Sequence, residues 1–292
     1  MLLTDLLPKP KGTLRICTYN LLNGGLDGWT DGLTSTRGLS TTRWRGQMEL
    51  LRKLDLDVLA VQEAKLYNSG GMAEATGKAL EMDWELAPSG SHGCHLVTFV
   101  RRGRVSFRGF VPDAAEGKFH HTLSRASLVS EESGWRFDLF NTHLAPFNPD
   151  DRSSEVGWVT EFGTADDVII AGDLNGMWPG DAEPENWDWL PVNLHSRHRR
   201  INPDGTYGPS NRDAQAKLRH AGFSDPVTSL GYPWGATVGH WSASENYPMR
   251  FDHILPSAGC SGRLRGWKII RTPNVCRLSD HLPVVADFSL ST

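Results

Sequence analysis

Residues 168–175 have the sequence Val-Ile-Ile-Ala-Gly-Asp-Leu-Asn. The first four are apolar and three of them are β-branched, a pattern that predicts a short strand buried on both faces. Asp173 and Asn175 follow two positions apart, so in an extended segment their side chains point the same way. A carboxylate beside an amide can orient an attacking water or a water bound to a metal ion. The same residues also suit an ordinary Asx turn after a strand, so residues 168–175 alone leave both interpretations open.

The length and composition are those of an ordinary globular protein. With 292 residues, 39% of them hydrophobic and 22% charged, the chain can bury a sizeable core. We find no linker and no repeat, and expect a single domain over residues 1–292, with a core that carries the motifs at 14–290 and a loop insertion at 181–210. The net charge of −4 argues against a protein that coats nucleic acid by bulk charge, although local basic patches remain open.

Cysteine usage and apolar runs indicate a cytoplasmic protein. The four cysteines show no CxxC spacing and no disulfide-like density. Residues 1–10 lack the features of a signal peptide, and no apolar run approaches the roughly 18 residues that a membrane span needs. We therefore expect a cytoplasmic monomer without a membrane span.

Polar residues stand at the ends of several other apolar runs. The strands predicted at 14–19 and 58–61 run into Asn20 and Glu63. Carboxylates and histidines placed beside apolar runs in this way do not resemble ordinary solvated surface charge. The candidate site residues selected on this basis are Asn20, Glu63, His143, Asp173, Asn175, Asp252, Asp280 and His281.

The rest of the chain predicts helices and hairpins around these strands. Thr42 and Ser153 are expected to cap two helices. With about ten to twelve strands in all, two packed sheets covered by helices are favoured over one open sheet. Further expected elements are helices at 72–80 and 213–221, strand pairs at 95–100 with 104–110 and at 123–129 with 135–142, strands at 251–255, 267–271 and 284–290, and a mobile loop at 27–40.

Six short motifs carry a family resemblance when they are taken together. The motifs are Thr18-Tyr19-Asn20, Val61-Gln62-Glu63, Asn141-Thr142-His143-Leu144, Gly172-Asp173-Leu174-Asn175, Phe251-Asp252-His253-Ile254 and Ser279-Asp280-His281-Leu282-Pro283. Each is weak alone, but their order from residue 18 to residue 283 resembles the endonuclease/exonuclease/phosphatase superfamily. The resemblance covers nearly the whole chain and implies the DNase I-like fold, a four-layered α/β sandwich of two packed mixed sheets flanked by helices.

The resemblance implies a metal ion and a set of ligands for it. Glu63 would be the principal ligand, helped by Asn20 and Asp280. Hard oxygen ligands that leave some waters in place suit Mg²⁺ or Mn²⁺. The implied reaction is in-line attack of an activated water on a phosphoester, in which the metal neutralises charge on a phosphate oxygen.

The resemblance also implies roles for the remaining residues. Asp173, held by Asn175, would orient or deprotonate the attacking water. Such a reaction depends on positioning and charge stabilisation rather than on a covalent nucleophile. His281 would donate a hydrogen bond to the phosphoryl group, and Asp252 would fix the tautomer of His281. His143 would donate from the other side, and Arg125 would contact a substrate phosphate.

Each residue also has an ordinary structural interpretation. His143 could be a hydrogen-bonded strand-end histidine, and Asn20 could be a turn former. Asp252 could pair with a structural arginine, and Arg125 could be a surface strand residue. We prefer the metal-centred interpretation because it accounts for all of these positions together.

Three features depart from the family pattern. In DNase I a carboxylate just before the middle strand supports the histidine equivalent to His143, whereas the matching segment here, Ser91–His95, contains no acid. Abasic-site endonucleases of this superfamily carry a tyrosine at the position of His143, which makes abasic-site repair a poorer match. Asp252 is followed by His253 where tyrosine or arginine is more usual.

The motifs imply the reaction and do not fix the substrate, for which we expect nucleic acid. A nuclease is favoured by basic residues that could form a phosphate-binding rim, Arg197–Arg200, Arg212, Lys217 and Arg219, and by tryptophans that could stack on bases. The alternative is a phosphatase or phosphodiesterase that acts on a nucleotide, a sugar phosphate or a lipid head group, with 181–210 as a lid. A binding module without catalytic activity is disfavoured because no acid or histidine of the motifs is missing.

Overall fold

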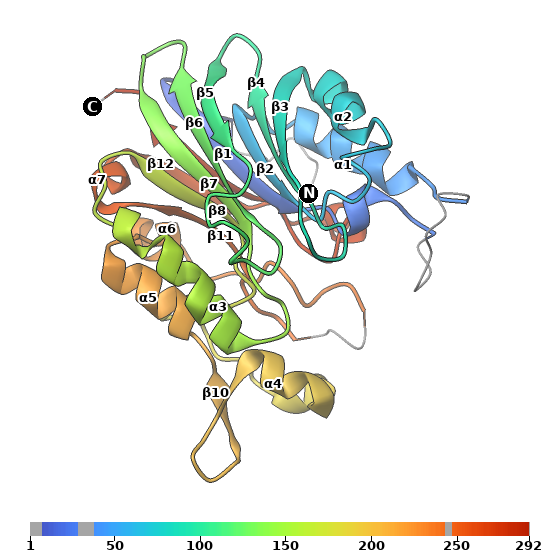
Figure 1. Cartoon of the computed structure of the whole chain (residues 1–292), viewed down its shortest axis with the longest axis vertical. Helices are drawn as coiled ribbons and strands as arrows, with labels where there is room; N and C mark the ends of the chain where they lie inside the picture. The colour runs from blue at the N-terminus through green and yellow to red at the C-terminus, as the bar shows by residue number, and fades with distance from the viewer. Residues whose placement is uncertain (1–7, 29–37, 243–246, 292) are drawn as a thin grey trace.

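The structure rests on two β-sheets that pack against each other (Figure 1). It is a computed structural model that describes residues 8–28, 38–242 and 247–291. The first sheet has six strands in the order β12-β13-β1-β2-β4-β3, and the second has five in the order β11-β8-β7-β6-β5. The strands of the first sheet are β1 (Thr13–Asn20), β2 (Val58–Gln62), β3 (Met82–Ala87), β4 (Leu96–Arg101), β12 (Leu264–Ile269) and β13 (Val284–Ser289). Those of the second are β5 (Val105–Val111), β6 (Leu123–Ser130), β7 (Arg136–His143), β8 (Val168–Asp173) and β11 (Asp252–Pro256).

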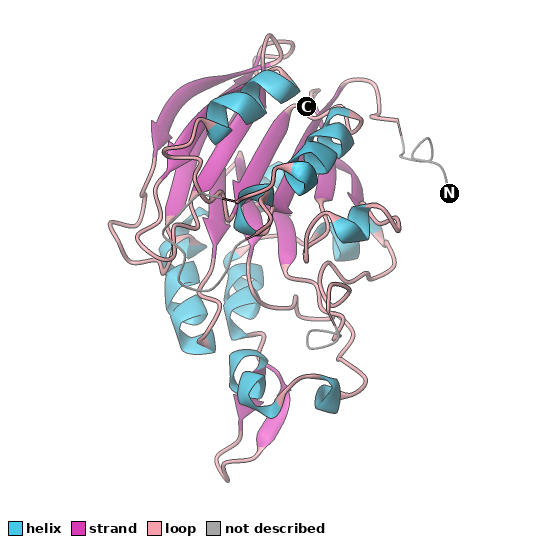
Figure 2. Cartoon of the chain, turned by 90° about the vertical axis from the view of Figure 1, so that its right-hand side faces the viewer, coloured by secondary structure: helices cyan, strands magenta, loops and turns pink. Residues whose placement is uncertain are grey.

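Helices cover the outer face of each sheet, so the molecule has four layers (Figures 1 and 2). Apolar side chains such as Ile16 and Ile169 fill the space between the sheets. Met48 and Leu80 pack helices α1 (Thr42–Arg52) and α2 (Met72–Leu80) on the first sheet. Leu218 packs α5 (Asp213–Ala221) on the second, and α3 (Pro149–Glu155) lies beside α5. The four-layered α/β sandwich is thus confirmed.

The insertion at 181–210 contains short elements that project beyond the two sheets (Figure 1). A two-stranded hairpin forms its tip. Its elements are the 3-10 turns η5 (Trp187–Trp189) and η6 (Val192–Leu194), helix α4 (His195–His198), and strands β9 (Arg199–Ile201) and β10 (Tyr207–Ser210). The remaining short elements are η2 (Asn23–Gly25), η3 (Val156–Trp158), η4 (Thr160–Phe162), α6 (Pro226–Leu230), α7 (Ala258–Ser261) and η8 (Val275–Arg277). Within the described ranges, no helix has the length and apolar character needed to cross a membrane.

Strand register brings the polar strand ends to one edge. Strands β1 and β2 are parallel, as are β7 and β8, so both pairs end side by side. His143 lies opposite Asp173 in the β7–β8 pair, and Asp252 lies opposite Asp173 in the antiparallel β8–β11 pair. Three candidate residues that are far apart in the sequence are therefore neighbours on adjacent strands.

Gly172 has a steric reason to precede Asp173. A Cβ atom built on Gly172 would lie 2.0 Å from the backbone oxygen of Thr142 on the neighbouring strand β7. Because that contact is with backbone rather than with a flexible side chain, any larger residue would push the two strands apart. The glycine therefore permits the close approach of β7 and β8 that places His143 beside Asp173.

One predicted strand pair is wrong. Strands β4 and β5 flank a tight turn in which Arg104 N–H donates to Arg101 O at 3.1 Å, but they belong to different sheets. Strand β4 already pairs with β2 on one edge and with β3 on the other, so it has no edge left for β5. Strand β3 was not predicted, because its exposed residues lack the alternation that marks a half-buried strand.

The predicted helix caps are also wrong by a few residues. Helix α1 begins at Thr42 itself, whose N–H donates to Ser40 Oγ at 3.2 Å. Helix α3 begins at Pro149, and the side chain of Asn148 accepts a hydrogen bond from Asp150 N–H at 3.0 Å. Asn148 followed by proline is the stronger start signal, because proline suits the first helical position. Most of the loop expected at 27–40 lies outside the described residues.

Candidate active site

A cavity of about 370 Å³ opens at the edge where these strands end. Two further candidates, Asn20 and Asp252, lie behind its wall and are fully buried. A second cavity, of about 410 Å³, lies between the N-terminal segment and the β4–β5 turn and has none of the candidates in its lining. The candidates that line the first cavity are Glu63, His143, Asp173, Asn175, Asp280 and His281.

Asp173 is the centre of the cluster. Its Oδ2 accepts a hydrogen bond from Asn20 Nδ2 at 3.1 Å and lies 3.3 Å from His143 Nε2 and 3.5 Å from His281 Nε2. Its Oδ1 accepts from Asn175 N–H at 2.9 Å. Burial alone would raise the pKa of Asp173, but the two imidazoles and these hydrogen bonds outweigh it and lower the pKa. Asp173 is therefore a stable carboxylate, suited to accepting a hydrogen bond from water.

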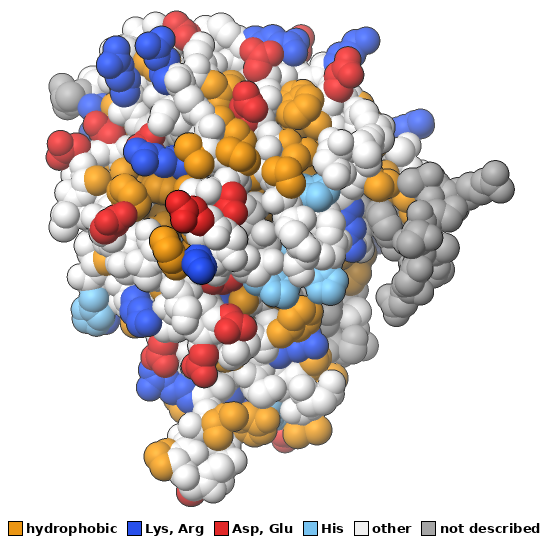
Figure 3. Space-filling model, viewed as in Figure 1, with side chains coloured by type: hydrophobic (Ala, Val, Ile, Leu, Met, Phe, Trp, Pro, Cys, Tyr) orange, Lys and Arg blue, Asp and Glu red, His pale blue; other side chains and the backbone are white. Residues whose placement is uncertain are grey.

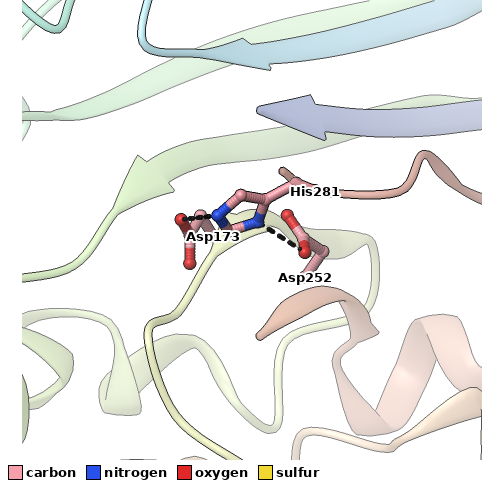
Figure 4. Close-up of side chains that lie close together, drawn as sticks. All are labelled: Asp173, Asp252 and His281. Atoms are coloured by element: carbon pink, nitrogen blue, oxygen red, sulfur yellow. Dashed lines mark hydrogen bonds and ion pairs between the residues drawn. The ribbon is translucent and has the colours of Figure 1, made fainter. Parts of the chain in front are cut away.

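His281 lies between two carboxylates (Figure 4). Its Nδ1 is 2.9 Å from Asp252 Oδ2, and its Nε2 faces Asp173. Burial would lower the pKa of His281, but Asp252 and Asp173 outweigh it and raise the pKa well above the ordinary value. These three residues are close enough to surround a cation, yet a protonated imidazole has no lone pair for a metal. We therefore interpret them as a hydrogen-bonded relay.

We predict that His281 stays protonated at neutral pH and that Asp252→Asn lowers its pKa. Because the folded-state pKa lies above the ordinary value of about 6.5, the stability from these ion pairs is complete below that value. It is lost as the pH rises through the raised pKa. Imidazole ¹⁵N chemical shifts followed against pH measure the pKa directly. Asp204→Asn, the same change in an exposed turn, serves as the control. An unchanged pKa for His281 in Asp252→Asn would contradict the relay.

Glu63 and Asp280 offer the oxygen ligands that a hard cation needs. Glu63 has a φ of 53°, in the left-handed region, which turns its side chain into the cavity. Its Oε1 accepts from Asn20 Nδ2 at 3.2 Å and its Oε2 accepts from Asn23 N–H at 3.0 Å, so each oxygen keeps a lone pair. Asp280 lines the same cavity, and its Oδ1 accepts from Ser279 Oγ at 3.2 Å. Two carboxylates on one cavity fit Mg²⁺ or Mn²⁺.

Asn20 connects the two halves of the cluster. Its Nδ2 donates to both Glu63 and Asp173, while its Oδ1 accepts from Leu22 N–H at 3.0 Å. The side chain is fully buried and does not line the cavity. Its position suits holding Glu63 and Asp173 in place more than it suits open coordination of a metal.

Arg125 is not brought to the site. Its guanidinium makes an ion pair with Asp138 at 2.5 Å and lies over the rings of Phe140 and Phe162. These partners are on the helix-covered side of the second sheet, and Arg125 does not line the cavity. The geometry therefore does not support the predicted phosphate contact.

Apart from Asp173, which faces its Nε2, the neighbour that supports His143 is a ring rather than an acid. His121 stacks on it with ring centroids 4.3 Å apart and planes 27° from parallel. Among the described residues, nothing forms a hydrogen bond with His143 Nδ1. Burial, with help from the neighbouring histidines, lowers the pKa of His121 to about 2, so a neutral imidazole packs on His143. Sequence reasoning missed His121, although the adjacent histidines 120 and 121 just before a predicted strand were a usable signal.

Arg43 is a second residue that sequence reasoning missed. It is 7% exposed and donates to four backbone carbonyls, including those of Leu21 and Leu22 at 2.8 Å. Another of the four is Leu278 O, at 3.1 Å. One buried guanidinium thus joins the loop after Asn20 to the loop before Asp280. Its Nε also pairs with Asp27 Oδ1 at 2.8 Å. No motif marks such an arginine, because most of its partners are backbone atoms.

Comparisons with known proteins identify a family and a fold. The family model described as "Endonuclease/Exonuclease/phosphatase family" matches residues 17–281. A search of curated proteins found no match. Similar solved structures include D. rerio TDP2 humanized by 14 mutations, with 18% identity, a TM-score of 0.63, and 95% of this chain and 99% of that chain covered.

Two further solved structures show the same fold at low identity. A mannosyl-6-phosphatase from Bacteroides thetaiotaomicron has 18% identity and a TM-score of 0.61, covering 94% of this chain and 98% of that chain. An AP endonuclease from Archaeoglobus fulgidus has 19% identity and a TM-score of 0.62, covering 94% of this chain and 99% of that chain.

Proposed function

Because this chain belongs to the endonuclease/exonuclease/phosphatase family, we propose that it is a divalent-metal-dependent hydrolase of phosphoric esters. The observation that carries the proposal is the convergence of His143 and His281 on Asp173 in a cavity that also holds Glu63 and Asp280. The similar structures include enzymes named for nucleic-acid and for sugar-phosphate substrates, so the family supports the reaction class without selecting the substrate.

Asp173 receives the attacking water in this proposal. A carboxylate with a lowered pKa is a weak base, so its main contribution is to accept a hydrogen bond and aim the water at phosphorus. Asn175 N–H and Asn20 Nδ2 hold the carboxylate while it does so. Protonated His281, fixed by Asp252, donates to a non-bridging phosphate oxygen, and His143 donates from the other side.

The metal would be held by Glu63 and Asp280, with Asn20 behind them. When bound, Mg²⁺ or Mn²⁺ supplies neutralisation of the charge that develops on the phosphate oxygens. Arg43 joins the loop that follows Asn20 to the loop that precedes Asp280 through its bonds to Leu21 and Leu278. Arg125 has no part in the proposed reaction.

The surface of the described residues favours a compact phosphate ester, or the end of a nucleic-acid strand, as the substrate. It is less suited to binding along the side of a long nucleic acid. Most of the basic rim expected for a nuclease has partners within the chain. Arg199 donates to Gly208 O at 2.7 Å, Arg200 pairs with Asp213, and Arg212 pairs with Glu183 at 2.8 Å. Of the four residues at 197–200, Arg197 and His198 line the cavity. A nuclease that grips a duplex needs several available cations.

We predict metal-dependent hydrolysis of compact esters in preference to plasmid DNA. The measurement compares plasmid and single-stranded DNA with a panel of nucleotides and sugar phosphates in Mg²⁺ or Mn²⁺. Asp173→Asn runs alongside to expose contaminating enzymes. Plasmid cleavage that disappears in this variant, with compact esters untouched, would make the protein a nuclease. No hydrolysis of any phosphoester by the folded wild-type protein would overturn the proposal.

A further inference from the structure

A row of rings runs along one side of the cavity, and three of its members, His143, His121 and Phe147, line it. The row starts with His143 and His121, whose centroids are 4.3 Å apart, and continues through His120 at 4.7 Å to Phe147 at 5.8 Å. At its far end the guanidinium of Arg197 lies over Phe147, with Cζ 4.8 Å from the ring centroid. Histidine side chains also gather on the right-hand half of the face shown in Figure 3, above hydrophobic and basic side chains. The row therefore leads from the reaction centre to a cation.

The charged group at the far end of this row is the guanidinium of Arg197. Burial lowers the pKa of His120 and of His121, so both rings are neutral at pH 7. Arg197 lines the cavity and, unlike Arg200, has no carboxylate partner within the described ranges. A half-buried guanidinium without an anion beside it is suited to binding a phosphate.

Two buried ionisable side chains of α3 hold this side of the cavity. Arg152 is 2% exposed and donates to Arg197 O at 2.5 Å and to Ala145 O at 3.0 Å. Glu155 accepts from His120 N–H at 2.6 Å and from Ala145 N–H at 2.8 Å. The backbone of Arg197 is therefore fixed relative to the segment that follows His143. With its backbone held and its guanidinium over the ring of Phe147, Arg197 loses less freedom on binding an anion than a mobile surface arginine does.

We propose that Arg197 binds a second phosphate of the substrate, while Phe147 contacts the group that links it to the phosphate being hydrolysed. The inference rests on the proposed function and narrows it to substrates with two phosphates. Two kinds of molecule carry two phosphates in this way: a free bisphosphate, and the end of a nucleic-acid strand with an adjacent phosphodiester. Phe147 is 48% exposed, so its ring is available to such a linking group.

The test measures binding in the Asp173→Asn background, where hydrolysis is expected to be slow. The probes are adenosine 3′,5′-bisphosphate, the dinucleotide pdApdA and adenosine 5′-monophosphate, titrated by calorimetry with Mg²⁺. We expect one of the two-phosphate probes to bind at least about tenfold more tightly than the monophosphate. Arg197→Ala should remove that preference and leave monophosphate binding unchanged, and Arg197→Lys should restore part of it.

The matched control is Arg200→Ala, which removes an arginine of the same insertion that pairs with Asp213 outside the cavity. It should leave the preference intact. A preference for adenosine 3′,5′-bisphosphate identifies a free bisphosphate, and a preference for pdApdA identifies a strand end. Equal binding of all three probes, or a preference that survives Arg197→Ala, would overturn the inference. Hydrolysis assays on the wild-type protein are separate, so failure of the proposed reaction would be recognised independently of this result.

Discussion

Replacing Asp173 with asparagine is expected to lower kcat by at least about a hundredfold, as for loss of a positioned acid–base or charge-stabilising group. The carboxylate is 1% exposed and faces two imidazoles and the amide of Asn20. Asparagine keeps the volume but removes the negative charge that keeps His281 protonated on its Nε2 side. It also places an amide where a strong hydrogen-bond acceptor is required. Steady-state hydrolysis of the best substrate measures the effect.

Folding must be checked alongside activity. The lowered pKa of Asp173 means that its charge contributes stability above the ordinary carboxyl pKa, and that this contribution is lost as the pH falls through the lowered value. The wild-type protein should therefore lose more stability on acidification than Asp173→Asn does. Thermal unfolding at several pH values separates this effect from catalysis. Asp204→Asn on the exposed hairpin is the matched control. Turnover near the wild-type rate in folded Asp173→Asn would remove Asp173 from the mechanism.

Chelation by EDTA is expected to abolish activity, and Mg²⁺ or Mn²⁺ to restore it. Glu63→Gln should weaken the affinity for Mn²⁺ by at least about tenfold. Loss of a residue that only orients a metal ligand typically costs about tenfold or more in metal affinity, and loss of the ligand itself should cost no less. Glutamine has the same shape as Glu63 and can still meet Asn20, but it lacks the charge that attracts a divalent cation. Electron paramagnetic resonance of free Mn²⁺ measures the affinity without depending on turnover.

The control for this change is Glu74→Gln, an exposed glutamate on α2 away from the cavity. Its Mn²⁺ affinity and activity should match those of the wild-type protein. Raising the Mg²⁺ concentration should recover part of the activity of Glu63→Gln, because weaker binding is compensated by mass action. Full activity in excess EDTA, or unchanged Mn²⁺ binding in Glu63→Gln, would exclude Glu63 as the principal ligand.

The sequence by itself determined the strand interiors and most of the candidate residues that line the cavity. Uninterrupted apolar runs such as 168–171 have to be buried wherever they lie, so hydrophobic pattern alone located β2 and β8. Polar residues directly after such runs lie at strand ends, where the sheet holds their backbone in place. Glu63 and Asp173 could therefore be recognised from their positions in the sequence. The family motifs added the order of these residues, and with it the fold.

Only the tertiary structure decided which side chains meet. Strands β4 and β5 looked like a hairpin, but the pairing of β4 with β2 and β3 sends β5 to the other sheet. Arg125 resembled a phosphate-contacting residue, but its guanidinium pairs with Asp138. The family pattern places an acid beside the histidine at position 143, whereas here the ring of His121 stacks on His143. Local periodicity fixes whether a residue is buried, whereas the partner of a polar side chain comes from a distant part of the chain. That partner is set by sheet register and layer packing.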